Sequence, residues 1–199
     1  ASAPTKGHIE ALVDERPASG TSIWSDVLDT DANGSNDNSY RQVVSASGIS
    51  TSGNRIRVTI PTGSSEGLLI DNVAIVERSG STGSGVTTPT EILFGGSSGV
   101  LISKSTNATS DWTDFEIDQT KDYLLIADIA TGSSNDTTRV VTGGGDGFYA
   151  LSTDSYNTAS FSGTYQSGRS IVFNKLEVAV KPTINTDIIG ELSRDGGTT

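Results

Sequence analysis

Short runs of β-branched and aliphatic residues, each ended by a stretch of Gly, Ser, Thr and Asn, constrain the fold of this chain most. Residues 55–60 alternate in polarity, which is typical of a strand with one buried face. Comparable runs occupy residues 68–70, 73–76, 123–129 and 171–180. No long stretch carries the apolar stripe of an amphipathic helix. Many short strands between turn signals predict an all-β fold, an antiparallel two-sheet β-sandwich of jelly-roll-like type with short terminal extensions.

The length and composition fit one such sandwich. The chain has 199 residues, of which 33% are hydrophobic, and this suits a thin core between two sheets. We expect residues 1–22 to form an N-terminal arm or docking strand, and residues 23–181 to form the sandwich. Residues 182–199 should be a linker and the start of a further β element. The residues expected in the core are Ile56, Val58, Ile70, Ile75, Phe94, Leu125, Val172 and Leu176.

The charge and the residue inventory disfavour several function classes. A formal net charge of -11, without a Lys/Arg cluster, argues against a nucleic-acid partner, because nothing would neutralise the phosphates. No run approaches the roughly 18 apolar residues of a membrane-spanning helix, so we expect no membrane insertion. The absence of Cys excludes disulfides and thiolate metal sites. The one histidine, His8, lies near the terminus and is a poor candidate for a catalytic base.

Residues 29–37 match the opening of a calcium-binding loop, in which several oxygens face one tight turn and Gly34 permits that turn. The candidate ligands of calcium, the one cofactor that the sequence suggests, are Asp29, Asp31, Asn33 and Asp37. Tyr40 stands where an EF-hand needs its bidentate glutamate, and no flanking helices are expected, so the site would be a single loop. The alternative is an Asx-rich turn that binds nothing.

Residues 95–99 match the G-x-S-x-G pattern of a nucleophile elbow, which would make Ser97 a nucleophile. That chemistry needs a helix after the serine, whereas residues 100–102 have strand character. We interpret the segment as a hairpin between residues 91–94 and 100–102. The sequence therefore predicts no catalytic residue and no enzymatic activity.

Acidic and aromatic residues form the remaining candidate site, for a glycan. Asp111 and Trp112 lie together in a polar loop, and a carboxylate beside an aromatic ring can hold a sugar. Two carboxylates that flank a sugar could also hydrolyse it. Tyr149 and Tyr156 are further candidates for stacking on a glycan. For each aromatic residue the alternative is ordinary packing against a sheet.

Two stretches of the chain carry a resemblance to a known family. The first comprises residues 55–60, 69–75 and 92–96, followed by Ser110-Asp111. In this order they resemble the non-catalytic β-sandwich that lies beside some SGNH-type hydrolases, and a similar module in virion proteins of tailed bacteriophages. The second stretch, residues 191–199, resembles a segment that often follows such modules in phage tail and head-appendage proteins.

The resemblance implies a bacteriophage virion structural protein, either a tail fibre or spike element or a decoration of the capsid or tail. Its partners would be other virion proteins and a host surface polysaccharide, and it would act as a homo-oligomer in the virion. The SGNH nucleophile block is absent, so hydrolase activity is not implied. The alternative is a carbohydrate-binding accessory module of a secreted hydrolase, which would be extracellular.

Overall fold

A computed structural model describes residues 20–28, 30–33, 38–64, 67–130, 137–142, 144–151 and 154–181. Gly20–Ala179 forms one compact unit. Within the described residues the fold is all-β, with no α-helix and a single turn of 3₁₀ helix, η1 (Ala46–Gly48). Most of the expected arm, residues 1–19, and the expected linker, residues 182–199, lie outside the described residues, so both stay predictions.

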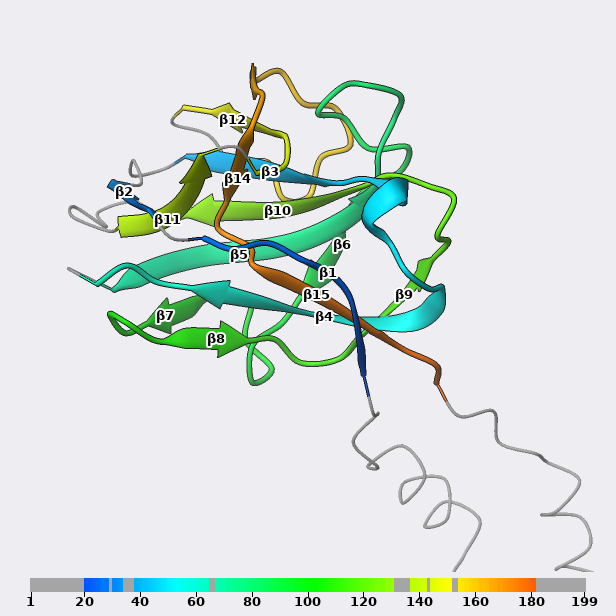
Figure 1. Ribbon diagram of the computed structural model, residues 1–199, viewed down its shortest axis with the longest axis horizontal. Coiled ribbons are helices and arrows are strands. Elements are labelled where there is room, and N and C mark those ends of the chain that lie inside the picture. Colours follow the sequence, from blue (N-terminus) through cyan, green and yellow to red (C-terminus); the bar gives the residue numbers. More distant parts are fainter. Residues whose placement is uncertain are drawn as a thin grey trace, which may run out of the picture. The chain divides into compact units, whose positions relative to one another are not determined.

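Two antiparallel sheets form the sandwich (Figure 1). The first sheet has the order β1-β15-β4, and both β8 and β9 pair with the far edge of β4. Its strands are β1 (Thr21–Ser25), β15 (Lys175–Ala179), β4 (Gly53–Pro61), β8 (Asn107–Thr109) and β9 (Thr113–Ile117).

The second sheet has the order β13-β12-β3-β10-β5, and β6 and β7 pair with successive parts of the outer edge of β5. Its strands are β13 (Thr164–Gln166), β12 (Gly147–Ala150), β3 (Ser39–Val44), β10 (Tyr123–Ile129), β5 (Leu68–Glu77), β6 (Thr90–Ile92) and β7 (Val100–Ile102). A three-stranded sheet has the order β14-β11-β2. Its strands are β14 (Arg169–Ile171), β11 (Thr137–Thr142) and β2 (Thr30–Asn33).

The strand pairing is that of a jelly roll. In chain order, the two large sheets are built on β1, β3, β4, β5, the pair β6/β7, the pair β8/β9, β10 and β15. The first of these pairs with the last, the second with the seventh, the third with the sixth and the fourth with the fifth. This nested antiparallel pairing places alternate strand pairs in opposite sheets, as two Greek keys do. The predicted two-sheet sandwich is therefore confirmed.

The main core lies between the two sheets. Along β4, Ile56, Val58 and Ile60 point inward and are fully buried. All eight residues expected in the core are buried and belong to this cluster. The period-two pattern of residues 55–60 thus specified the correct inward face.

A second, smaller cluster covers the other face of the second sheet. Val43, Val76, Leu124 and Ile126 lie in it, together with the half-buried ring of Phe161. Every residue of β10 is therefore buried, because the sheet is covered on both faces. This explains why its sequence is a nearly continuous apolar run, although we expected a strand with only one buried face.

Some local predictions were wrong. Residues 171–180 do not form one long strand: β14 ends at Ile171 and β15 begins at Lys175. Between them Val172 has a φ of 76°, which no strand accommodates. On the edge of β12 away from β3 the partner strand is β13, and residues 159–161, which precede it, have no strand structure.

Two expected loops are interrupted or bounded by strands. Residues 29–37, expected as one loop, include β2, and the polar loop of Asp111 and Trp112 is only the short connection between β8 and β9. These strands are short and polar, so propensity alone did not reveal them.

Candidate functional site

The G-x-S-x-G segment forms a tight turn. Phe94 and Ser97 exchange two backbone hydrogen bonds, of 2.8 and 3.2 Å, around Gly95 and Gly96. Both glycines have positive φ, +60° and +79°, as a type I′ turn requires. β6 and β7 do not pair with each other, because both pair with β5, so the expected hairpin is confined to this four-residue turn. Ser97 is exposed and, within the described residues, no helix follows it.

Asp111 fastens this turn to the first sheet. Its Oδ2 accepts a hydrogen bond of 2.7 Å from the Gly96 N–H, and its own N–H donates to the Leu93 carbonyl at 2.8 Å. The neighbouring Ser110 continues the connection, since its hydroxyl accepts from the Val58 N–H at 3.0 Å. These contacts join residues 55–60, 92–96 and 110–111, which are three of the stretches that carry the first resemblance. One oxygen of the Asp111 carboxylate is already engaged there.

Trp112 lies half-buried against the outer face of the first sheet. The Arg57 guanidinium stacks on its ring, 4.8 Å from the ring centroid, and the indole edge packs against Gly20. Arg57 in turn donates to both oxygens of Glu177, at 2.7 and 3.2 Å. The Lys175 ammonium lies 3.0 Å from the same carboxylate. The hydrogen bonds from Arg57 and Lys175 hold the pKa of Glu177 below its ordinary value.

The expected calcium loop falls largely outside the described residues. Asp29 and Asp37 are not described. The backbone of Asp31 and Asn33 lies in β2, opposite Arg139 and Thr137 of β11. The calcium site stays a prediction. Among the residues that the structure describes, no group of three or more His, Cys, Asp or Glu side chains is arranged to hold a metal ion.

A buried charged cluster lies on the outer face of the second sheet, and sequence reasoning missed it. Arg41 is completely buried on β3. Its guanidinium donates to three backbone carbonyls, those of Gly83 at 3.0 Å, Ser155 at 2.7 Å and Thr158 at 2.8 Å. It also stacks on Phe161, 4.4 Å from the ring centroid. One arginine thus holds two segments that lie far away in the chain.

Asp128 completes this cluster from the neighbouring strand, β10. Its Oδ2 accepts hydrogen bonds from the backbone N–H groups of Ser155 and Tyr156, both at 2.9 Å. Burial raises the pKa of Asp128 above its ordinary value, although the hydroxyl of Ser39 and these two N–H groups oppose the effect. Burial lowers the pKa of Arg41 to about 10, so it stays charged at neutral pH. We call this pair and the backbone that it holds the Arg41–Asp128 clamp.

The sequence does carry a signal for the clamp. Arg41 and Asp128 are charged residues inside short strand runs that are otherwise largely apolar. Charges at such positions are rarely buried without partners, so each one indicates a buried polar network. What the sequence does not show is that their partners are backbone groups of residues 83 and 155–158.

The structure separates the four residues expected to bind a glycan. Asp111 and Trp112 belong to the first sheet, beside β9, whereas Tyr149 lies on β12 in the second sheet. Tyr156 packs on the smaller cluster and lies within the segment that the clamp holds. Tyr149 points the other way, toward the main core. The four residues therefore do not form one site, and glycan binding by any of them stays a prediction.

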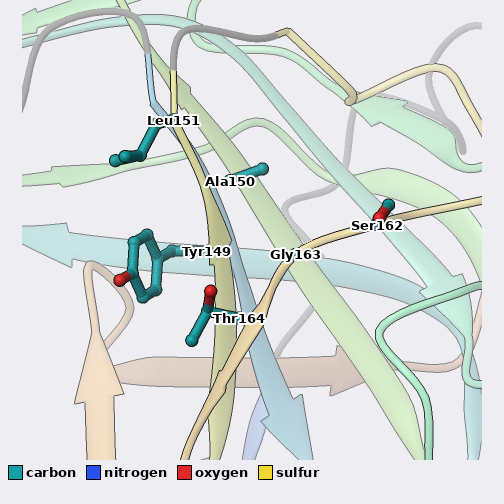
Figure 2. A pocket seen from close by; sticks show the side chains of 6 residues that line it. All are labelled: Tyr149, Ala150, Leu151, Ser162, Gly163 and Thr164. Atoms are coloured by element: carbon teal, nitrogen blue, oxygen red, sulfur yellow. The ribbon is translucent and has the colours of Figure 1, made fainter.

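Tyr149 is the only one of the four that lines a described pocket. The pocket is an open hollow of about 460 Å³ where β12 and the segment that leads into β13 diverge (Figure 2). Its lining residues are Tyr149, Ala150, Leu151, Ser162, Gly163 and Thr164.

No family model matches the chain, and no curated protein matches it in sequence. Within its described part, the chain has no helix with the length and apolar character that a membrane crossing requires.

Proposed function

We propose that this chain is a structural protein of a tailed-bacteriophage virion, a tail fibre or spike element or a decoration of the capsid or tail. Its jelly roll would be a module held away from the particle body. The first support is the resemblance to such modules of residues 55–60, 69–75, 92–96 and 110–111, and of residues 191–199. Jelly rolls also serve as capsid and lectin domains, so the fold is compatible with the proposal without requiring it.

The observation that carries the proposal is the pairing of the first strand with the last. Thr21 of β1 lies opposite Val178 of β15, so the chain enters and leaves the sandwich at neighbouring points (Figure 1). A domain whose two connections lie side by side can project from a larger assembly without its core being interrupted. The opposite end of the sandwich then faces outward. This geometry suits an appendage or a decoration.

The engagement of three carboxylates in contacts within the fold favours a binding role over a reaction. Asp111 holds the Gly96 turn, Glu177 binds Arg57, and Asp128 holds the Ser155 backbone. These carboxylates serve the fold. The single histidine, His8, lies outside the described residues.

Association with particles tests the proposal. Virions of the phage that encodes the chain would be purified by density gradient, and the chain would be quantified by mass spectrometry against the major capsid protein. We expect a fixed copy number per particle that survives a high-salt wash, and a symmetric homo-oligomer in solution. A chain that never sediments with particles would contradict the proposal.

A carbohydrate-binding accessory module of a secreted hydrolase is the second candidate, and the uncharged hollow beside Tyr149 favours it. The two candidates differ in where the protein is found. A monomer that occurs only in culture supernatant, together with an esterase or glycosidase, would support the second.

A further inference from the structure

The hollow beside Tyr149 is lined by neutral groups. Although the chain has a net charge of -11, none of the six described residues that line the hollow is charged. An anionic ligand would meet no cation there, and a cationic ligand would meet no carboxylate. The lining therefore selects for an uncharged ligand.

The two faces of the β12–β13 hairpin differ. Tyr149 lies opposite Thr164, while Phe148 lies opposite Tyr165. Because side chains alternate along a strand, Tyr149 and Thr164 project to one face, and Phe148 and Tyr165 project to the other. Figure 2 shows Leu151 on the same side of β12 as Tyr149, and Leu151 is 65% exposed. One face of the hairpin thus presents an aromatic ring, an aliphatic side chain and a hydroxyl group together.

The polar groups of this face are available to a ligand. In the described part of the chain, no hydrogen bond engages the phenol of Tyr149 or the hydroxyl of Thr164. Gly163 brings the backbone close to Tyr149, since a Cβ at this position would lie 2.5 Å from the Tyr149 carbonyl oxygen. Backbone groups and hydroxyls without hydrogen-bond partners, beside the ring of Tyr149, are suited to a molecule with many hydroxyls and an apolar face.

The hollow is also held in shape before any ligand arrives. The Arg41–Asp128 clamp binds the backbone at Ser155, Tyr156 and Thr158, and Arg41 stacks on Phe161. The segment that enters the hollow, residues 162–164, follows directly. A wall that is ordered in the free protein reduces the entropy lost on binding.

We propose that this hollow binds the ring of a neutral hexose in a host polysaccharide, stacked on the exposed side of Tyr149 and hydrogen-bonded by Thr164. The hexose C–H groups would pack on Tyr149 and Leu151. This assignment rests on the proposed function, because it specifies the class of host molecule that a virion module of this kind would contact.

The test is a titration of the ¹⁵N-labelled full chain, followed by NMR, with glucose, galactose, mannose and their oligosaccharides. Glucuronate serves as the charged counterpart with the same ring. We expect saturable shifts confined to residues 149–151 and 162–164 with at least one neutral hexose, and weaker binding of glucuronate. No saturable shift in these residues with any neutral sugar would overturn the proposal, and so would glucuronate binding as tight as that of glucose.

Three variants separate the site from the rest of the hairpin. Thr164→Val keeps the shape and removes one hydroxyl, and it should weaken binding about five- to tenfold, as the loss of one hydrogen bond does. Tyr149→Ala should abolish binding, and its NMR spectrum shows whether the fold is intact. Tyr165→Ala removes the ring on the opposite face of the same hairpin and should bind like the wild type. Equal affinity for Thr164→Val and the wild type would overturn the assignment.

The two proposals fail separately. Absence of sugar binding would leave the copy number of the chain in purified virions unchanged. If the chain were absent from virions, the sugar titration would still show whether the hollow binds a neutral hexose. A positive titration would then favour the accessory-module alternative.

Discussion

The Arg41 guanidinium on β3 donates to the Ser155 carbonyl at 2.7 Å, between residues that are 114 positions apart in the chain. This contact joins a central strand of the second sheet to a segment with no strand structure. It holds in place the segment that covers the smaller hydrophobic cluster, and with this segment the entry to the hollow beside Tyr149.

Replacement of Arg41 by lysine should therefore be costly although the charge is retained. One ammonium group cannot reach the carbonyls of Gly83, Ser155 and Thr158 together, and it cannot stack flat on Phe161. We expect Arg41→Lys to lower the free energy of unfolding by about 2 to 3 kcal/mol, measured by urea denaturation. Lys104→Ala, at an exposed position, is the control and should change it by less than about 0.5 kcal/mol. An Arg41→Lys variant as stable as the wild type would show that the clamp contributes nothing.

The carboxylate of Asp111 should act on stability through the Gly95-Gly96 turn. Asp111→Ala removes the acceptor of the Gly96 N–H, and we expect a loss of about 1 to 2 kcal/mol in the free energy of unfolding. Gly96→Ala should cost about 1 kcal/mol independently, because alanine is strained at a φ of +79°. The exposed Glu91→Ala is the matched acidic control. If Asp111→Ala and Glu91→Ala were equally stable, the hydrogen bond from Gly96 to Asp111 would contribute nothing to stability.

Trp112 and Arg57 should be energetically coupled. A double-mutant cycle of Trp112→Ala and Arg57→Met should give a coupling of about 0.5 to 1 kcal/mol for the cation–π contact of the two side chains. Additive effects would contradict this pairing. The NMR titration of Trp112→Ala with a neutral hexose should match that of the wild type, since the hollow lies on the other sheet.

The stability of the protein should decline in acid partly through Glu177. Because the pKa of Glu177 is lower in the folded protein than in the unfolded chain, its contribution is present above the ordinary pKa of 4.5. That contribution is lost as the pH falls through the folded-state pKa. We expect Glu177→Gln to melt below the wild type at neutral pH, and the difference between their melting temperatures to shrink below pH 4.5. A constant difference across the pH range, with Glu91→Gln as control, would contradict this linkage.

Ser105 offers a substitution that should stabilise the fold. It is exposed, with a φ of 55°, and its N–H donates to the Gly63 carbonyl at 2.8 Å. Glycine adopts this conformation without the steric cost that L side chains incur. We expect Ser105→Gly to raise the free energy of unfolding by up to about 1 kcal/mol. A melting temperature below that of the wild type in thermal denaturation would show that the backbone is not strained there.

Strand alternation made much of the sandwich predictable from sequence. Residues 55–60 and 123–129 coincide closely with β4 and β10, because their side chains report burial directly. The break at Val172 was not predictable, because β-branched residues normally favour the extended conformation, whereas Val172 is fully buried with a φ of 76°. A local sequence pattern indicates which face of a strand is apolar, whereas segments distant in the chain decide whether that face is buried.

The same dependence on distant segments explains why the candidate site was only partly predictable from the sequence. Trp112 and Tyr149 both looked available for stacking in the sequence, yet Arg57 already stacks on Trp112. The partners of Arg41 and Asp128 are backbone groups, which carry no signature in side-chain composition. The hollow beside Tyr149 depends on Gly163, and no local motif distinguishes this glycine from the other glycines of the chain.

The most direct test of the proposed function is cryo-electron microscopy of purified virions of the phage that encodes the chain. We expect density that fits the jelly roll, Gly20–Ala179, at symmetry-related positions on the tail or capsid surface. The ends of β1 and β15 at Thr21 and Val178 should face the particle body, and the hollow beside Tyr149 should face solvent. Particles that lack this density, or a jelly roll whose Thr21–Val178 end faces away from the particle, would contradict the account.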